Sequence, residues 1–112
     1  MVSVETARRL ALAFEETDEK AHFENVSFRV KKKIFLTLNP KENRACIKLS
    51  EIDQSVFCAY DKTIIYPVPN KWGKHGWTLV NLKKIRKEFF KDALTCAYCE
   101  VAPGKLASKY RL

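Results

Sequence analysis

The chain has 112 residues, of which 46% are hydrophobic, so it can form one domain with its own core and is too short for two domains of ordinary size. Lysine and arginine number 21 against 13 aspartates and glutamates, and the formal net charge of +8 favours partners with phosphate or acidic groups. No apolar stretch approaches the roughly 20 residues of a membrane span and no signal peptide is visible, so we expect one cytoplasmic domain, residues 1–112, without a membrane partner.

The first expected element is a helix from Ser3 to about Glu16. Its apolar residues recur at steps of three and four, namely Val4, Ala7, Leu10, Ala11 and Phe14. Ser3 is suited to cap this helix, because its hydroxyl can accept a hydrogen bond from an amide of the first turn.

Three strands are expected next, because the hydrophobic period changes to two. Hydrophobic and other residues alternate over 26–30, 34–38 and 45–49. The segments between them, 31–33 and 40–43, are short enough to be hairpin turns. We therefore expect an antiparallel meander with one face open to water.

The second half of the chain is expected to contain a short helix, two strands and a long helix. Ser50 is a candidate N-cap for the short helix, whose apolar face would consist of Ile52, Val56, Ala59 and Tyr60. A strand over 64–68 contains Pro67 and is expected at a sheet edge or strand end. A strand over 77–82 and a helix over about 83–100 follow, and after Pro103 we expect a short basic tail.

The order α-β-β-β-α-β-β-α predicts an α+β fold, in which a five-stranded antiparallel sheet carries its helices on one face. Several short motifs in this order resemble the MmcQ/YjbR family. These are His22-Phe23, Ser27-Phe28-Arg29-Val30, Lys33-Ile34-Phe35, Lys48-Leu49-Ser50 and Gly76-Trp77-Thr78. The resemblance covers nearly the whole chain and implies a CyaY-like fold, also described as a double wing, and a DNA-binding protein without catalytic residues.

The chain departs from the family pattern at two places where glycines are expected. Glu24 follows His22-Phe23, and the first hairpin has Lys31-Lys32-Lys33. The tip of this hairpin therefore carries additional positive charge, which favours an anionic partner.

The sheet face away from the helices is the first candidate site. Alternation places on it Ser27, Arg29, Lys31, Phe35, Thr37, Arg44, Cys46 and Lys48. The cations could neutralise phosphates while Phe35 stacks on an unpaired base or packs against a sugar. The competing interpretation is that Phe35 is covered by the C-terminal tail or a partner, and that the cations are ordinary solvated residues.

The segment from Trp72 to Trp77 is the second candidate site. It combines two large aromatic residues with two glycines, which permit tight backbone turns, and with Lys74 and His75 as possible phosphate contacts. The competing interpretation is that Trp77 packs in the core and the glycines only make the turn. With both segments included, the expected DNA contacts are Arg29, Lys31, Lys32, Lys33, Phe35, Arg44, Lys48, Lys74 and His75.

The cysteines are expected to be reduced packing residues. Cys46, Cys58, Cys96 and Cys99 have apolar neighbours, and the C-x-x-C formed by the last two falls inside a helix without a second pair at ligand spacing. We therefore expect no disulfide, no metal site and no cofactor.

No catalytic motif such as a P-loop or G-x-S-x-G is present, so a binding protein without enzymatic activity is favoured, although folding could still assemble a catalytic site. The leading hypothesis is a monomer that binds DNA with little sequence preference. The alternative is a module that docks an acidic protein partner, a peptide or a small ligand on the open sheet face. Lys83, Lys87 and Lys91 form a second basic stripe, expected on the last helix.

Overall fold

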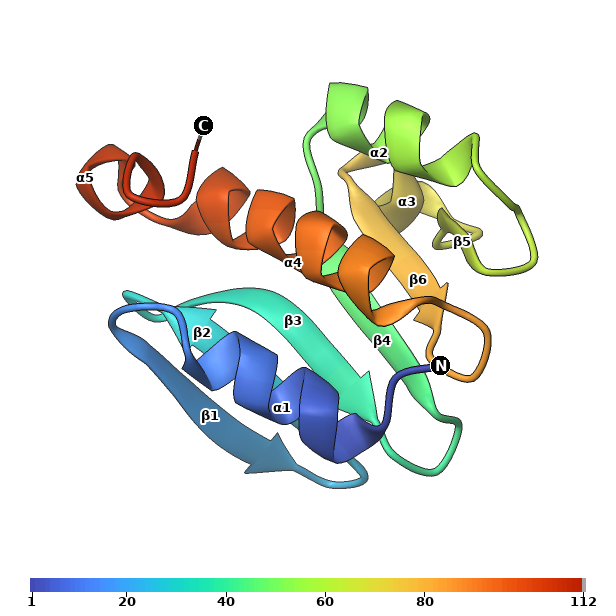
Figure 1. Ribbon diagram of the computed structural model, residues 1–112, viewed down its shortest axis with the longest axis horizontal. Coiled ribbons are helices and arrows are strands. Elements are labelled where there is room, and N and C mark those ends of the chain that lie inside the picture. Colours follow the sequence, from blue (N-terminus) through green and yellow to red (C-terminus); the bar gives the residue numbers. More distant parts are fainter. Residues whose placement is uncertain (112) are drawn as a thin grey trace.

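The computed structural model describes residues 1–111, which form an α+β domain around one antiparallel sheet. Its elements are α1 (Val4–Leu12), β1 (Thr17–His22), β2 (Asn25–Val30), β3 (Lys33–Asn39), β4 (Arg44–Lys48), α2 (Glu51–Cys58), β5 (Ile65–Pro67), α3 (Lys71–Lys74), β6 (Trp77–Asn81), α4 (Lys87–Val101) and α5 (Gly104–Ala107). The sheet is six-stranded, in the order β1-β2-β3-β4-β6-β5. Helices α1 and α4 lie across the same face of this sheet (Figure 1).

The three expected strands and both expected hairpins are confirmed. Strands β2, β3 and β4 pair as an antiparallel meander. Lys31 and Lys32 form a two-residue turn with φ of 50° and 70°, the backbone that matches the twist of a tight hairpin. Strand β5, which contains Pro67, pairs only with β6 and lies at the sheet edge as predicted.

The prediction of five strands is wrong, because β1 precedes the meander. The first helix ends at Leu12, and Glu16, with φ of 57°, turns the chain into this strand. Within β1 only Thr17 is partly buried and the other residues are exposed. Strand β1 is held in the sheet by its backbone hydrogen bonds to β2. Since its side chains are not buried, its sequence has no hydrophobic alternation from which a strand could be predicted.

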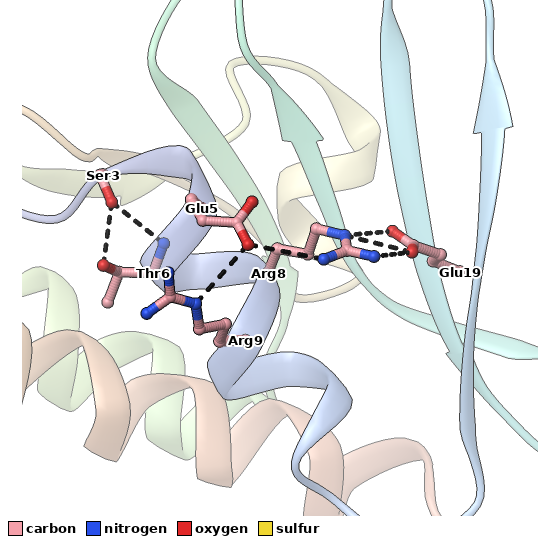
Figure 2. Close-up of polar contacts among 6 residues, drawn as sticks. All are labelled: Ser3, Glu5, Thr6, Arg8, Arg9 and Glu19. Atoms are coloured by element: carbon pink, nitrogen blue, oxygen red, sulfur yellow. Dashed lines mark hydrogen bonds and ion pairs between the residues drawn. The ribbon is translucent and has the colours of Figure 1, made fainter.

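The first helix is fixed at its beginning and along one side, as Figure 2 shows. Ser3 caps α1 as expected, since its Oγ accepts a hydrogen bond of 3.0 Å from the amide of Thr6. The guanidinium of Arg8 makes a forked contact with the carboxylate of Glu19 on β1, with Nε 2.9 Å from Oε2 and Nη2 2.5 Å from Oε1. This contact lowers the pKa of the Glu19 carboxyl, through hydrogen bonding from Arg8 and through its charge.

The last long helix begins later than predicted, at Lys87. Asn81 stops β6, and its side-chain oxygen accepts a hydrogen bond of 3.0 Å from the amide of Lys83, which forms a turn before the helix. Ile85 is still buried, but from this turn. The expected C-terminal tail instead forms α5, whose Leu106 and Ala107 are buried.

A β-bulge in β3 overturns the expected position of Phe35. Phe28 pairs with Leu36 and Arg29 with Ile34, so Phe35 has no partner on β2. A bulge places two successive side chains on one side of a sheet, and both Phe35 and Leu36 are fully buried. The Phe35 ring meets the ring of Tyr98 on α4 edge to face, with centroids 5.5 Å apart. Phe35 is therefore a core residue and cannot stack on a base.

The predicted apolar face of α2 is also wrong. Ser50 caps the helix as expected, but Ile52 and Val56 are 77% and 65% exposed. Gln54 turns the opposite side of α2 toward the sheet, because its Nε2 donates hydrogen bonds of 2.9 Å to the Gly73 carbonyl and 3.1 Å to the Thr78 hydroxyl. The helix thus packs through Gln54 together with Phe57 and Cys58, while Ile52 and Val56 face outward.

None of the helices within residues 1–111 has the length and the apolar character needed to cross a membrane.

Candidate nucleic-acid interface

The candidate site is the side of the sheet opposite α1 and α4, which we call the open face. The strand registers place the following side chains on it: Asp18, Lys20, His22, Asn25, Ser27, Arg29, Ile34, Thr37, Asn39, Arg44, Cys46, Lys48, Tyr66, Trp77, Leu79 and Asn81. Asp18 is the one carboxylate at these positions. The open face therefore has a basic half on β1 to β3 and an aromatic half on β5 and β6.

The basic half contains a hollow of about 330 Å³. It is lined by Lys20, His22, Asn25, Ser27, Arg29, Lys32, Ile34 and Thr37. Lys20 and Lys32 are exposed. Ile34 provides the apolar contact surface that the sequence analysis had assigned to Phe35. The Oδ1 atom of Asn25 is buried and has no hydrogen-bond partner within residues 1–111. The hollow thus offers cations and polar groups to an anionic ligand.

Three of the predicted phosphate contacts are already engaged within the protein. The Nε atom of Arg29 lies 2.8 Å from Oδ1 of Asp18. The Nζ atom of Lys31 lies 2.5 Å from the Glu16 carboxylate and lowers the pKa of that carboxyl. The Nζ atom of Lys48 donates to the backbone carbonyl of His75. These cations still contribute positive potential, but each has less freedom to reach a ligand.

The other predicted contacts do not all lie together. Lys32 points into the hollow, whereas Lys33 pairs with the buried Val30 and so lies on the helix side of the sheet. Arg44 lies on β4, between the two halves. Lys74 and His75 are exposed at the end of α3, beside the aromatic half. The open face thus joins most of the predicted site residues, except Lys33 and the buried Phe35.

The aromatic half contains the second candidate site, the segment from Trp72 to Trp77, together with Tyr66, which the sequence did not indicate. Trp77 is partly buried on the open face, while its neighbour Thr78 faces the core. Tyr66 pairs with Leu79 of β6 and shares this face. Trp72 of α3 is 54% exposed, and a shallow apolar pocket is lined by Cys46, Val68, Trp72 and Trp77. The idea that Trp77 packs in the core is wrong, and the sequence could not have shown it, because Trp77 and Leu79 are as hydrophobic as Thr78 and Val80 on the other face.

The two glycines of this segment are required by its backbone, as the competing interpretation held. A Cβ on Gly73 would lie 2.0 Å from the carbonyl oxygen of Val68. Gly76 has φ of 98°, and a Cβ there would lie 1.9 Å from the carbonyl oxygen of Leu49. Only glycine fits positions where another backbone comes this close.

The four cysteines are free thiols. Burial raises the pKa of both the Cys46 and the Cys96 thiols to about 11. Cys99 is buried, and its Sγ donates to the Ala107 carbonyl at 3.6 Å. Among residues 1–111 no three histidine, cysteine or acidic side chains are grouped so as to hold a metal ion.

Comparison with known proteins gives two matches. Residues 12–100 match the family model described as YjbR. The crystal structure of Deinococcus radiodurans protein DR2400, described with a domain of the family DUF419, is similar with a TM-score of 0.80 and 18% identity, over 98% of this chain and 88% of that chain. At this identity the likeness shows the fold alone. No curated protein matches the chain.

Proposed function

The chain belongs to the YjbR family, and on that premise we propose that it is a non-enzymatic DNA-binding domain that binds through its open face. The proposal includes the CyaY-like, or double-wing, description of the fold, a monomeric state and a cytoplasmic location.

The excess of cations over carboxylates at the strand positions of the open face is the observation that carries the proposal. The strand positions of the open face contain Lys20, Arg29, Arg44 and Lys48 against the single carboxylate Asp18. Neutralising phosphates with such cations releases counterions, which supplies most of the affinity in binding that does not depend on sequence. The open face is therefore suited to a polyanion.

The shape of the face accounts for the low sequence preference. Six strands and a short hairpin form a broad surface, and its cations are spread over several strands. Contacts to phosphates position a nucleic acid but do not read its bases. The proposed binding therefore follows charge and shape.

An acidic protein partner is the second candidate. The shallow pocket lined by Cys46, Val68, Trp72 and Trp77 is almost wholly apolar, and such a patch beside cations would also suit a partner with hydrophobic and acidic side chains. Competition separates the two candidates. Displacement of bound DNA by polyglutamate at equal charge concentration would favour the protein partner.

The test is a titration of a labelled short duplex and of oligothymidylate at several salt concentrations. Affinity should fall with salt, with slopes of log K of roughly −0.9 and −0.7 per phosphate neutralised on duplex and single strand. Absence of binding to both oligonucleotides at low salt would remove the proposal.

Two charge-reversed variants locate the site. Lys20→Glu with Lys32→Glu changes exposed residues of the basic half and should abolish most of the binding. Lys87→Glu with Lys91→Glu makes the same charge change on exposed residues of α4, and should lose only the long-range share that salt screens. Equal losses in two folded variants would show that binding follows net charge alone.

A further inference from the structure

The aromatic half of the open face is held rigidly by backbone hydrogen bonds. The Trp77 carbonyl accepts a hydrogen bond of 3.0 Å from the Val68 amide, and the Gly76 carbonyl accepts one of 2.9 Å from the Leu49 amide. The amide of Trp72 donates to Oδ1 of Asn70 at 2.9 Å and fixes the start of α3. The backbone that carries the two indole rings is therefore fixed before any ligand binds, which reduces the entropy lost on binding.

Three cations lie near these rings, on the paired strand or on α3 itself. Residues 62–87 contain no aspartate or glutamate. Lys48 pairs across the strands with Trp77, while Lys71 and Lys74 flank Trp72 on α3. Aromatic rings within a positive surface suit a ligand that carries flat apolar groups on an anionic backbone.

We propose that Trp72, Trp77 and Tyr66 form a base-stacking platform and that the open face therefore prefers single-stranded DNA. This rests on the proposed function and goes beyond it, since cations alone would also bind a duplex. Every base has a flat face that can stack on an aromatic ring, but in a duplex those faces are already stacked on one another. Only unpaired bases can reach the platform.

The two halves of the open face can act on one strand. A row of paired positions crosses the whole sheet, from Lys20 through Ser27, Thr37, Cys46 and Leu79 to Tyr66. Neighbouring strands lie about 4.8 Å apart, so the five steps of this row span about 24 Å. A strand of a few nucleotides can thus place phosphates on the basic half and bases on the aromatic half.

The experiment uses the intrinsic fluorescence of the chain, because Trp72 and Trp77 are its two tryptophans. The whole protein is titrated with oligothymidylate, an abasic oligomer with the same number of phosphates, a short duplex, and an RNA oligomer of the same length. We expect oligothymidylate to quench the fluorescence and to bind more tightly than the abasic oligomer and the duplex, while the RNA oligomer, whose bases are also unpaired, tests the assignment to DNA. The abasic oligomer should bind with salt dependence but without quenching.

Substitution of the platform gives the second readout. Trp72→Ala, at an exposed position, should weaken oligothymidylate binding by roughly 5- to 150-fold, or about 1–3 kcal/mol, and leave binding of the abasic oligomer unchanged. Tyr60→Ala is the matched control, because Tyr60 is an aromatic residue 61% exposed that follows α2 and lies against Phe89 of α4, and it should change neither affinity.

The results that would overturn the inference differ from those that would overturn the proposed function. If the abasic oligomer binds as tightly as oligothymidylate and Trp72→Ala has no effect, the open face binds phosphates without stacking, and the proposed function stands. If the RNA oligomer binds most tightly, the assignment to DNA fails. If none of the oligomers binds at low salt, the proposed function itself fails.

Discussion

The Nε atom of Arg29 lies 2.8 Å from Oδ1 of Asp18, across the β1–β2 pair of the open face. The Asp18 side chain is 52% exposed, so solvent screens the pair and it contributes little to stability. The ion pair has a larger effect on binding. It places Asp18, the one carboxylate at the strand positions of the open face, beside the hollow, and it holds Arg29, one of the cations that line the hollow.

We therefore expect Asp18→Asn to strengthen DNA binding. The substitution removes the carboxylate and leaves Arg29 available to a phosphate, so affinity at low salt should rise by roughly three- to tenfold and the salt slope should steepen by up to about 0.9. Titrations with the labelled duplex at several salt concentrations measure both quantities.

The control for this gain is Glu5→Gln. Glu5 pairs with Arg8 and Arg9 on α1, so its removal makes the same change in net charge on the helix side of the molecule. An equal gain of affinity from this variant would show that only net charge matters.

Phe35→Ala should destabilise the protein without affecting the site. The ring is fully buried against Phe14 and Tyr98, and its removal leaves a cavity that should cost about 3–5 kcal/mol of unfolding free energy. Urea denaturation measures this loss. Trp72→Ala should change stability by less than about 0.5 kcal/mol, because Trp72 is exposed. A loss of oligothymidylate binding in folded Phe35→Ala would contradict its place in the core.

Gly76→Ala should be strongly destabilising. The new Cβ would meet the Leu49 carbonyl, and φ of 98° is strained for any other residue, so we expect a loss of about 2–6 kcal/mol. Gly104→Ala is the matched control, because a Cβ there meets nothing within 4 Å, and its stability should change by less than about 1 kcal/mol. Thermal unfolding of both variants by circular dichroism compares them.

Arg8→Gln should reduce stability in a way that depends on pH. Arg8 lowers the pKa of Glu19 in the folded protein below its ordinary value of 4.5. The ionised pair therefore stabilises the fold fully above that value, and the contribution is lost as pH falls through the lowered pKa. The difference in unfolding free energy between wild type and variant should be largest near neutral pH and should shrink below about pH 4.5.

Arg9→Gln provides the comparison for this pH profile. Its side chain is 75% exposed, and its ion pair within residues 1–111 is with Glu5, at 3.6 Å. Denaturation curves between acidic and neutral pH should show a smaller and flatter difference for Arg9→Gln. Matching profiles for the two variants would rule out the Arg8–Glu19 contact as the source.

The sequence was sufficient for the features that depend on local chemistry. The caps at Ser3 and Ser50 and the Lys31-Lys32 turn follow from short-range hydrogen bonding and turn geometry, and all are present. Strand β2 was predicted from the alternation of Val26, Phe28 and Val30, which is likewise a short-range pattern in the sequence.

The errors concern features decided by pairing and packing. Ile34, Leu36 and Leu38 alternate regularly, so only the pairing of β3 with β2 reveals that the bulge turns Phe35 inward. Because β1 has no periodic pattern, Lys20 and His22 could not be assigned to the site. For Trp77, both faces of β6 are hydrophobic in the sequence, so only the pairing with β4 shows that this side chain lies on the open face.

The two edge strands of the sheet, β1 and β5, explain how the protein tolerates a sheet face that no helix covers. An edge strand with unpaired backbone groups can pair with strands of other molecules and start aggregation. Here β1 presents the charged side chains of Asp18, Glu19 and Lys20. At the other edge β5 is only three residues long and ends at Pro67, which has no amide hydrogen to donate. The protein can therefore expose one face of its sheet without promoting aggregation through strand pairing between molecules.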